Sequence, residues 1–118
     1  MRKLTHDLVQ SMGGEADLHI DVGYPCVMNN EQLSNNAKQL AASYLGADNV
    51  SETELRMGAE DFGYYAQQIP ACFYRLGTMN KSKGIISGVH TPTFNIDEDA
   101  IETGMGMMAW LGSQVRLS

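Results

Sequence analysis

The stretch GVHTPTFNIDEDAI, residues 88–101, joins a histidine-bearing loop to the start of a helix. Gly88 lets the backbone approach a neighbouring group closely, and Pro92 restricts the residue before it to extended geometry. His90 therefore stands in a loop whose local conformation is narrowly limited. This pattern alone leaves two interpretations open: a solvent-exposed loop histidine beside a well-capped helix, or a ligand for a bound group.

Three acidic residues open the helical pattern that follows. Asp97, Glu98 and Asp99 supply a cap and negative charge where a helix N-terminus carries partial positive charge. The helix is predicted to run to about Arg116, whose cation suits the negative end of the helix dipole. The three carboxylates thus have a sufficient explanation as cap and dipole partners, without a metal-binding role.

The predicted carboxy-terminal helix has one apolar face and several glycines. The apolar face carries Ile101, Met105, Met108, Gly112 and Val115. A glycine inside a helix costs about 1 kcal/mol relative to alanine. The glycines at 104, 106 and 112 therefore predict close packing of this helix on a sheet.

Hydrophobic periodicity predicts the remaining elements. These are helices over residues 1–12, 31–45 and about 61–68, and strands over residues 16–22 and 71–77. Asn30 is expected to cap the second helix, which Gly46 ends. Residues 78–89 form a long glycine-containing loop, of the kind that more often has a function than not. The alternation of helices and strands predicts an α/β fold class.

Composition excludes several classes of function. The chain has 118 residues, enough for one ordinary domain at most, and a net charge of −6. Without clustered lysine and arginine, binding to nucleic acid is not expected. No run approaches the roughly 20 apolar residues of a membrane span, so no membrane association is expected. Cys26 and Cys72 are too few and too far apart for a disulfide framework, which favours a reduced, cytoplasmic setting.

Three features in order resemble a known family. They are MGAEDFGYY at residues 57–65, a strand ending in LG, and H-T-P-x-F-x-I-D-E-D-A at residues 90–100. Together they are similar to the carboxy-terminal part of the metal-dependent amidohydrolases related to hippurate hydrolase, N-acetyl-diaminopimelate deacetylase and the indole-acetyl-amino-acid hydrolases. Members of that family combine a catalytic α/β domain, which holds two metal ions, with a smaller α/β lid that also dimerises.

The resemblance implies a domain organisation for this chain. The chain is expected to be a fragment of a two-domain, zinc-peptidase-like α/β fold. Residues 1–23 then correspond to the last helix and strand of the lid, residues 24–30 to the linker, and residues 31–118 to the carboxy-terminal part of the catalytic domain.

The resemblance also implies roles for particular residues. In the intact enzyme His90 is expected to bind one of two divalent ions, which could be zinc, manganese or cobalt. Gly58, Glu60 and Asp61 are expected beside the substrate pocket, although adjacent acids at a helix start are usually a cap and its neighbour. The other metal ligands and the general-base glutamate belong to an amino-terminal portion that these residues do not include. The chain by itself is therefore expected to bind no metal and to contain no catalytic residue.

Two functions from different classes follow. The first is a carboxy-terminal fragment, inactive alone, of a metal-dependent hydrolase that cleaves the amide bond of N-acyl amino acids or small peptides. The second is a non-catalytic remnant that keeps the fold and serves as an interaction or dimerisation module. A homo-oligomer is expected in either case, because a piece cut from two domains exposes apolar surface. The acyl group, the amino acid and the metal depend on residues outside this sequence.

Overall fold

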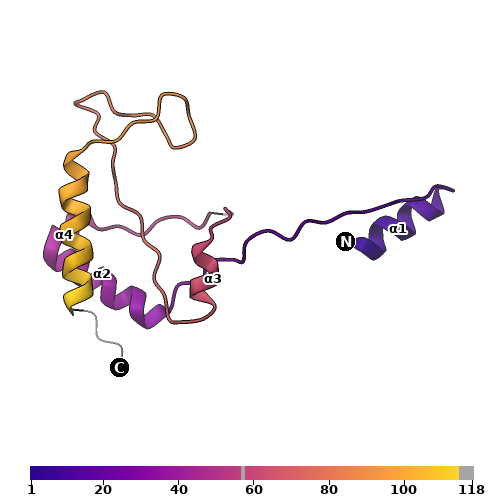
Figure 1. Cartoon of the computed structure of the whole chain (residues 1–118), viewed down its shortest axis with the longest axis horizontal. Coiled ribbons are helices and arrows are strands. Elements are labelled where there is room, and N and C mark those ends of the chain that lie inside the picture. The colour runs from indigo at the N-terminus through magenta and orange to yellow at the C-terminus, as the bar shows by residue number, and fades with distance from the viewer. Residues whose placement is uncertain (57, 115–118) are drawn as a thin grey trace.

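A computed structural model describes residues 1–56 and 58–114 of the chain. Its helices are α1 (Arg2–Ser11), α2 (Glu31–Leu45), the short 3-10 helix η1 (Ala47–Asn49), α3 (Phe62–Ala66) and α4 (Asp99–Gln114), as Figure 1 shows. The predicted helices over 1–12 and 31–45 are confirmed. The helix predicted over about 61–68 is confirmed in part, because regular helix ends at Ala66 and turns continue the segment.

Local side-chain chemistry determines the ends of α2. The Asn30 side chain accepts a hydrogen bond from the Leu33 backbone N–H at 2.9 Å, which satisfies a donor that has no partner within the helix. At the other end, Gly46 adopts a φ of 88°, a conformation that glycine enters without steric cost. The predicted cap and stop of this helix are both confirmed.

The core lies between α2 and α4. Its buried residues are Ala37 and Ala41 of α2 and Met107 and Leu111 of α4, with Leu40, Leu45, Val50 and Cys72 partly buried around them. The indole N–H of Trp110 donates to the Leu40 carbonyl at 3.1 Å, so one polar group also crosses this interface. Small alanines on α2 let the two helix axes approach closely.

The face of α4 that packs is not the predicted one. Ile101, Met105 and Met108 are exposed, whereas Met107 and Leu111 are buried. The glycines do mark close approaches, but not to a sheet: a Cβ at Gly106 would meet Tyr44 of α2, one at Gly104 would meet Leu76, and one at Gly112 would meet nothing within 4 Å. Because α4 is apolar on more than one side, its pattern could not say which side α2 covers. The predicted positions Val115 and Arg116 lie outside the described residues.

The predicted strands do not form in the part of the chain that the structure describes. Residues 16–22 and 71–77 have no hydrogen-bonded strand beside them, and the one isolated bridge joins Asn80 to Ile85. A strand needs a paired neighbour, and a period-two pattern cannot guarantee one. Where an α/β alternation was expected, the described residues are therefore helical or irregular.

A side-chain amide takes the place of a strand partner for one segment. The Asn29 side chain donates to the Phe73 carbonyl at 2.9 Å and accepts from the Phe73 N–H at 2.8 Å. Next to it, the Asn30 N–H donates to the Ala71 carbonyl at 2.8 Å. These bonds fix the chain just before α2 against residues 71–73.

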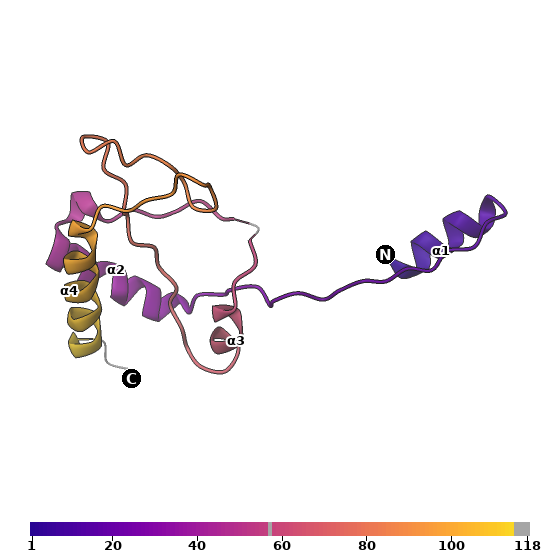
Figure 2. The ribbon, with the colours of Figure 1, turned by 45° about the horizontal axis from the view of Figure 1, so that its top comes forward.

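Residues 1–23, here called the arm, extend away from the rest of the chain in both ribbon views (Figures 1 and 2). Within the arm, Arg2 donates from its guanidinium to the Leu18 carbonyl at 2.9 Å, which holds α1 against the returning segment. Just after the arm, Tyr24 meets Tyr64 of α3 edge to face, with ring centroids 6.0 Å apart. The predicted linker over 24–30 is thus packed against α3 at its start, and the predicted domain boundaries stay a prediction.

Candidate functional site

His90 occupies a strained turn in the segment between residues 78 and 98, here called the His90 loop. Its φ of 63° makes it the sole non-glycine residue with a positive φ in the described parts of the chain. Histidine is among the few residue types enriched in this left-handed region, yet the conformation still costs free energy. The turn is held by the Thr91 hydroxyl, which donates to the Gly88 carbonyl at 2.8 Å, and by the Phe94 N–H, which donates to the Thr91 carbonyl at 3.1 Å.

The imidazole of His90 is available to a ligand. The residue is exposed, and neither ring nitrogen takes part in a hydrogen bond with the residues that the structure describes. A neutral imidazole can present one nitrogen lone pair to a metal ion. Just outside the turn, the hydroxyls of Ser87 and Thr93 lie 2.8 Å apart and link the two sides of the loop.

The two ends of the His90 loop are joined by charged and amide groups. The Lys83 ammonium donates to Asp97 at 2.7 Å and to Asp99 at 2.6 Å, and the Asn80 side-chain amide donates to the other Asp97 oxygen at 2.5 Å. The Asp97 N–H also donates to the Thr78 carbonyl at 2.9 Å. We call Asn80, Lys83, Asp97 and Asp99 the clasp.

The contacts of the clasp shift the pKa values of Lys83 and Asp97. The hydrogen bond from Lys83, followed by that from Asn80, holds the pKa of the Asp97 carboxyl below its ordinary value. The hydrogen bonds to Asp97 and then to Asp99 raise the pKa of the Lys83 ammonium above its ordinary value. Both shifts favour the charged forms of Lys83 and Asp97.

The cap interpretation of the acids after the loop is partly confirmed. The Asp97 carboxylate accepts from the Asp99 N–H at 3.4 Å, at the first residue of α4. The main partners of Asp97 are nevertheless Lys83 and Asn80, and no motif in the sequence connects these residues to Asp97. Lys83 and Asp97 are fourteen positions apart, so no helical or strand period connects them.

The three predicted pocket residues lie at the approach to α3. Gly58 is exposed with open space around it, Glu60 is half-buried and Asp61 is exposed. Asp61 precedes α3, but its side chain makes no cap hydrogen bond, so the predicted side-chain cap is wrong. The structure does not bring α3 to the loop that carries His90, and the two lie apart in both ribbon views (Figures 1 and 2).

The sequence profile described as "Peptidase family M20/M25/M40" matches residues 5–112. The chain belongs to this family. The match contains both motifs on which the resemblance was based, at 57–65 and 90–100, and it confirms that resemblance.

Named relatives agree with the family match. The chain is 37% identical over 86 residues to "IAA-amino acid hydrolase ILR1-like 6" of Arabidopsis thaliana, covering 73% of this chain and 18% of the relative. It is 32% identical over 106 residues to "Thermostable carboxypeptidase 2" of Saccharolobus solfataricus, covering 88% of this chain and 26% of the relative. It is also 32% identical over 102 residues to "Uncharacterized hydrolase SERP0968" of Staphylococcus epidermidis, covering 83% of this chain and 26% of the relative.

The chain spans about a fifth to a quarter of the length of these curated relatives. No solved structure matches it significantly. Membership of the M20/M25/M40 family indicates a zinc-peptidase-like fold, although the strand pairing of such a fold is not present in residues 1–56 and 58–114.

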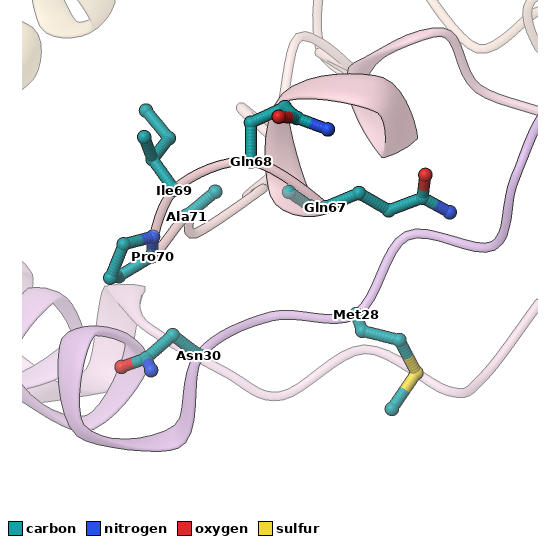
Figure 3. A pocket seen from close by; sticks show the side chains of 8 residues that line it. Met28, Asn30, Gln67, Gln68, Ile69, Pro70 and Ala71 are labelled. Atoms are coloured by element: carbon teal, nitrogen blue, oxygen red, sulfur yellow. The ribbon is translucent and has the colours of Figure 1, made fainter.

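Among the hollows on the described surface of this member of the M20/M25/M40 family, two lie beside α2. The first, of about 290 Å³, lies between the turn that follows α3 and the segment before α2, and Figure 3 shows its lining by Met28, Asn30 and residues 66–71. The second, of about 660 Å³, lies between α2, residues 72–77 and the buried side of α4. Neither hollow is lined by His90, Gly58, Glu60 or Asp61.

Within the described ranges, no group of three or more histidine, cysteine, aspartate or glutamate side chains is placed to hold a metal ion. His90 fits one position of a metal site, as an exposed imidazole, but one donor does not make a site. Both cysteines are free thiols. None of the helices in the described residues is long and apolar enough to cross a membrane.

Proposed function

We propose that this chain is the carboxy-terminal portion of a metal-dependent hydrolase that cleaves the amide bond of N-acyl amino acids or small peptides. The family match supports the class of enzyme. Relatives whose names include an IAA-amino acid hydrolase and a carboxypeptidase support the substrate class, because both names describe cleavage next to an amino acid. The chain covers only 18% and 26% of the length of those relatives, which supports the proposal that it is one portion of a longer enzyme.

The observation that carries the proposal is the conformation of His90. A strained backbone persists only where the surroundings hold it, and such strain concentrates at functional sites. Here the strained residue is a histidine with an exposed and unbonded imidazole, inside the segment that matches a peptidase family. His90 would therefore hold one of two divalent ions, zinc, manganese or cobalt, in the intact protein.

Each part of the chain has a defined task in this proposal. A divalent ion in such a site polarises the scissile carbonyl and lowers the pKa of water. His90 supplies one nitrogen donor at the tip of the closed loop. Gly58, Glu60 and Asp61, which line neither of the hollows beside α2, shape the substrate pocket of the intact protein. The remaining ligands and the general base come from outside these residues, so the chain alone binds no metal with useful affinity.

We also propose that the protein is a cytoplasmic homo-oligomer. Both cysteines are free thiols, as expected in a reducing compartment. The arm presents exposed apolar side chains at Leu4, Leu8, Met12 and Val22. Such a surface favours association between copies, including exchange of the arm between two chains.

The same arm favours a second candidate function. A helix with exposed Leu4 and Leu8, extended away from the α2 and α4 core, is suited to an interaction or dimerisation module without catalysis. Mass spectrometry of the polypeptide from its native source separates the two functions. A mass several times that of 118 residues supports the hydrolase, whereas a mass equal to that of this chain supports the module.

The test of the metal role uses the longest native polypeptide and the substitution His90→Asn. Asparagine tolerates the left-handed conformation, so the backbone is kept while the imidazole is removed. We expect the metal content to fall by about one ion per chain, because one donor of a small ligand set is lost. Turnover of N-acetyl and N-benzoyl amino acids should fall by about two orders of magnitude or more.

The matched control is His6→Asn, which removes an exposed imidazole from α1, far from the His90 loop. Metal content and turnover should stay at wild-type values in the control. If His90→Asn also kept wild-type metal content and turnover, His90 would not be a ligand and the proposal would fail.

A further inference from the structure

The His90 loop is closed from its base to its tip by contacts between residues equally far from His90. Lys83 and Asp97 stand seven positions before and seven positions after His90, and their side chains are 2.7 Å apart. Ser87 and Thr93 stand three positions on either side, and their hydroxyls are 2.8 Å apart. Side chains thus join the two sides of the loop in the way that backbone hydrogen bonds join a hairpin.

The base of the loop contains more contacts than an ordinary surface ion pair. Lys83 bridges two carboxylates, those of Asp97 and Asp99, and Asn80 donates to the remaining oxygen of Asp97. The Asp97 side chain is 13% exposed, so most of its surroundings are protein rather than water. Isolated exposed pairs contribute little, but a network around a shielded carboxylate is screened less by salt.

The Asn80 side chain also organises the turn that presents Lys83. Its carbonyl oxygen accepts from the Ser82 N–H at 3.1 Å, from the Ser82 hydroxyl at 2.7 Å and from the Lys83 N–H at 3.3 Å. The Asn80 and Ile85 backbones exchange two hydrogen bonds of 2.9 Å each around this turn. The lysine is therefore directed back toward Asp97 by a structured turn and not by a flexible chain.

We propose that Lys83 is a positioning residue, which, through Asp97 and Asp99, closes the base of the loop and holds the His90 imidazole in place for its ligand. This inference rests on the proposed role of His90. A ligand donor has to be held to within about half an ångström of its working position, and a long loop cannot do so unless its ends are fixed. Without Lys83, the two carboxylates that now share its ammonium would also repel each other at the start of α4.

The closure of the loop can be measured in the 118-residue chain, without a metal. In Lys83→Met, hydrogen exchange at the hydrogen-bonded amides of Ile85, Phe94 and Asp97 should become about two- to fivefold faster, the range expected for loss of such pairs. Lys83→Arg should restore slow exchange, because a guanidinium can also bridge two carboxylates. The control is Lys81→Met in the same turn, whose side chain forms no ion pair among the described residues.

The salt dependence of hydrogen exchange provides an independent check that charge interactions of Lys83 cause the slow exchange. In about 1 M salt the difference between wild type and Lys83→Met should shrink only in part, because salt screens the pair with the exposed Asp99 more than the pair with the shielded Asp97. Exchange at the amides of Ile85, Phe94 and Asp97 that is the same in wild type, Lys83→Met and Lys83→Arg would overturn the proposal, since the loop would then be closed by other contacts.

The positioning role itself is tested in the longest native polypeptide by titration with zinc alone. Lys83→Met should weaken zinc binding about tenfold, within the range found for groups that orient a metal ligand, and Lys83→Arg should recover it. Weak zinc binding in His90→Asn together with wild-type binding in Lys83→Met would overturn the positioning role and leave the proposed function intact. Wild-type zinc binding in His90→Asn would overturn the proposed function, and the positioning role with it.

Discussion

Gly106 of α4 faces the side chain of Tyr44 of α2, and Gly106→Ala tests the packing of these helices. A Cβ at this position would lie 2.0 Å from the Tyr44 hydroxyl oxygen and 3.0 Å from the ring carbon that bears it. Both distances are too short, so the Tyr44 ring has to move. That ring stacks on Trp110, with centroids 6.1 Å apart and an interplanar angle of 22°.

The expected change in the free energy of unfolding on Gly106→Ala has two opposing contributions. Alanine in place of glycine favours the helix by about 1 kcal/mol. Overpacking costs about 1 to 3 kcal/mol, and displacement of a stacked ring adds about 0.5 to 1.5 kcal/mol. Because Tyr44 is 46% exposed, its ring can move outward into solvent, and the costs of overpacking and of ring displacement should lie at the lower ends of their ranges. We expect Gly106→Ala to reduce the free energy of unfolding by about 1 kcal/mol.

Gly112→Ala in the same helix is the matched control. A Cβ at Gly112 meets nothing within 4 Å, so only the helix propensity changes and the free energy of unfolding should rise by about 1 kcal/mol. The two variants should therefore differ by about 2 kcal/mol. In Gly106→Ala combined with Tyr44→Phe, part of the loss should be recovered, because the nearest clashing atom is removed.

Urea unfolding followed by tryptophan fluorescence measures these differences. Trp110 is the single tryptophan of the chain, and it is half-buried between α2 and α4, so its emission reports on this interface. An increase in stability for Gly106→Ala equal to that for Gly112→Ala would refute the reasoning, since α2 would then not cover Gly106.

Three further predictions concern other parts of the chain. Asn30→Ala should lower the stability of α2 by about 1 kcal/mol, because the Leu33 N–H loses its side-chain acceptor. Thermal unfolding followed by circular dichroism measures this loss, and an unchanged unfolding midpoint would contradict the role of Asn30 as a cap. The 118-residue chain should hydrolyse no N-acetyl or N-benzoyl amino acid with added zinc, manganese or cobalt, and turnover that survives purification and is lost in His90→Ala would contradict this. Light scattering should detect a dimer or larger species, and a clean monomer at high concentration would count against the proposed oligomer.

The features that could be predicted from the sequence are those that depend on near neighbours in the chain. The α2 helix was predicted with both ends because its cap at Asn30 and its stop at Gly46 act within a single turn. The family resemblance could be recognised from two short motifs, at residues 57–65 and 90–100, and from their order in the sequence. The second motif contains His90, which made this residue the candidate metal ligand.

The features that could not be predicted depend on contacts between distant residues. The strands over 16–22 and 71–77 failed because pairing requires a second segment, and in the described chain Phe73 finds the side chain of Asn29 instead. The prediction of which face of α4 packs was wrong. A helix that is apolar on several sides has no single preferred buried face until α2 lies against one of them.

For the His90 loop, the sequence by itself identified His90 as the candidate ligand and indicated that Pro92 would restrict the residue before it. Only the tertiary structure decided the left-handed conformation of His90 and the partners of Lys83. The physical reason is the range of the interactions. Backbone preferences act over one or two residues, whereas an ion pair that closes a loop depends on where the chain returns, and that point is determined by the packing of the whole fold.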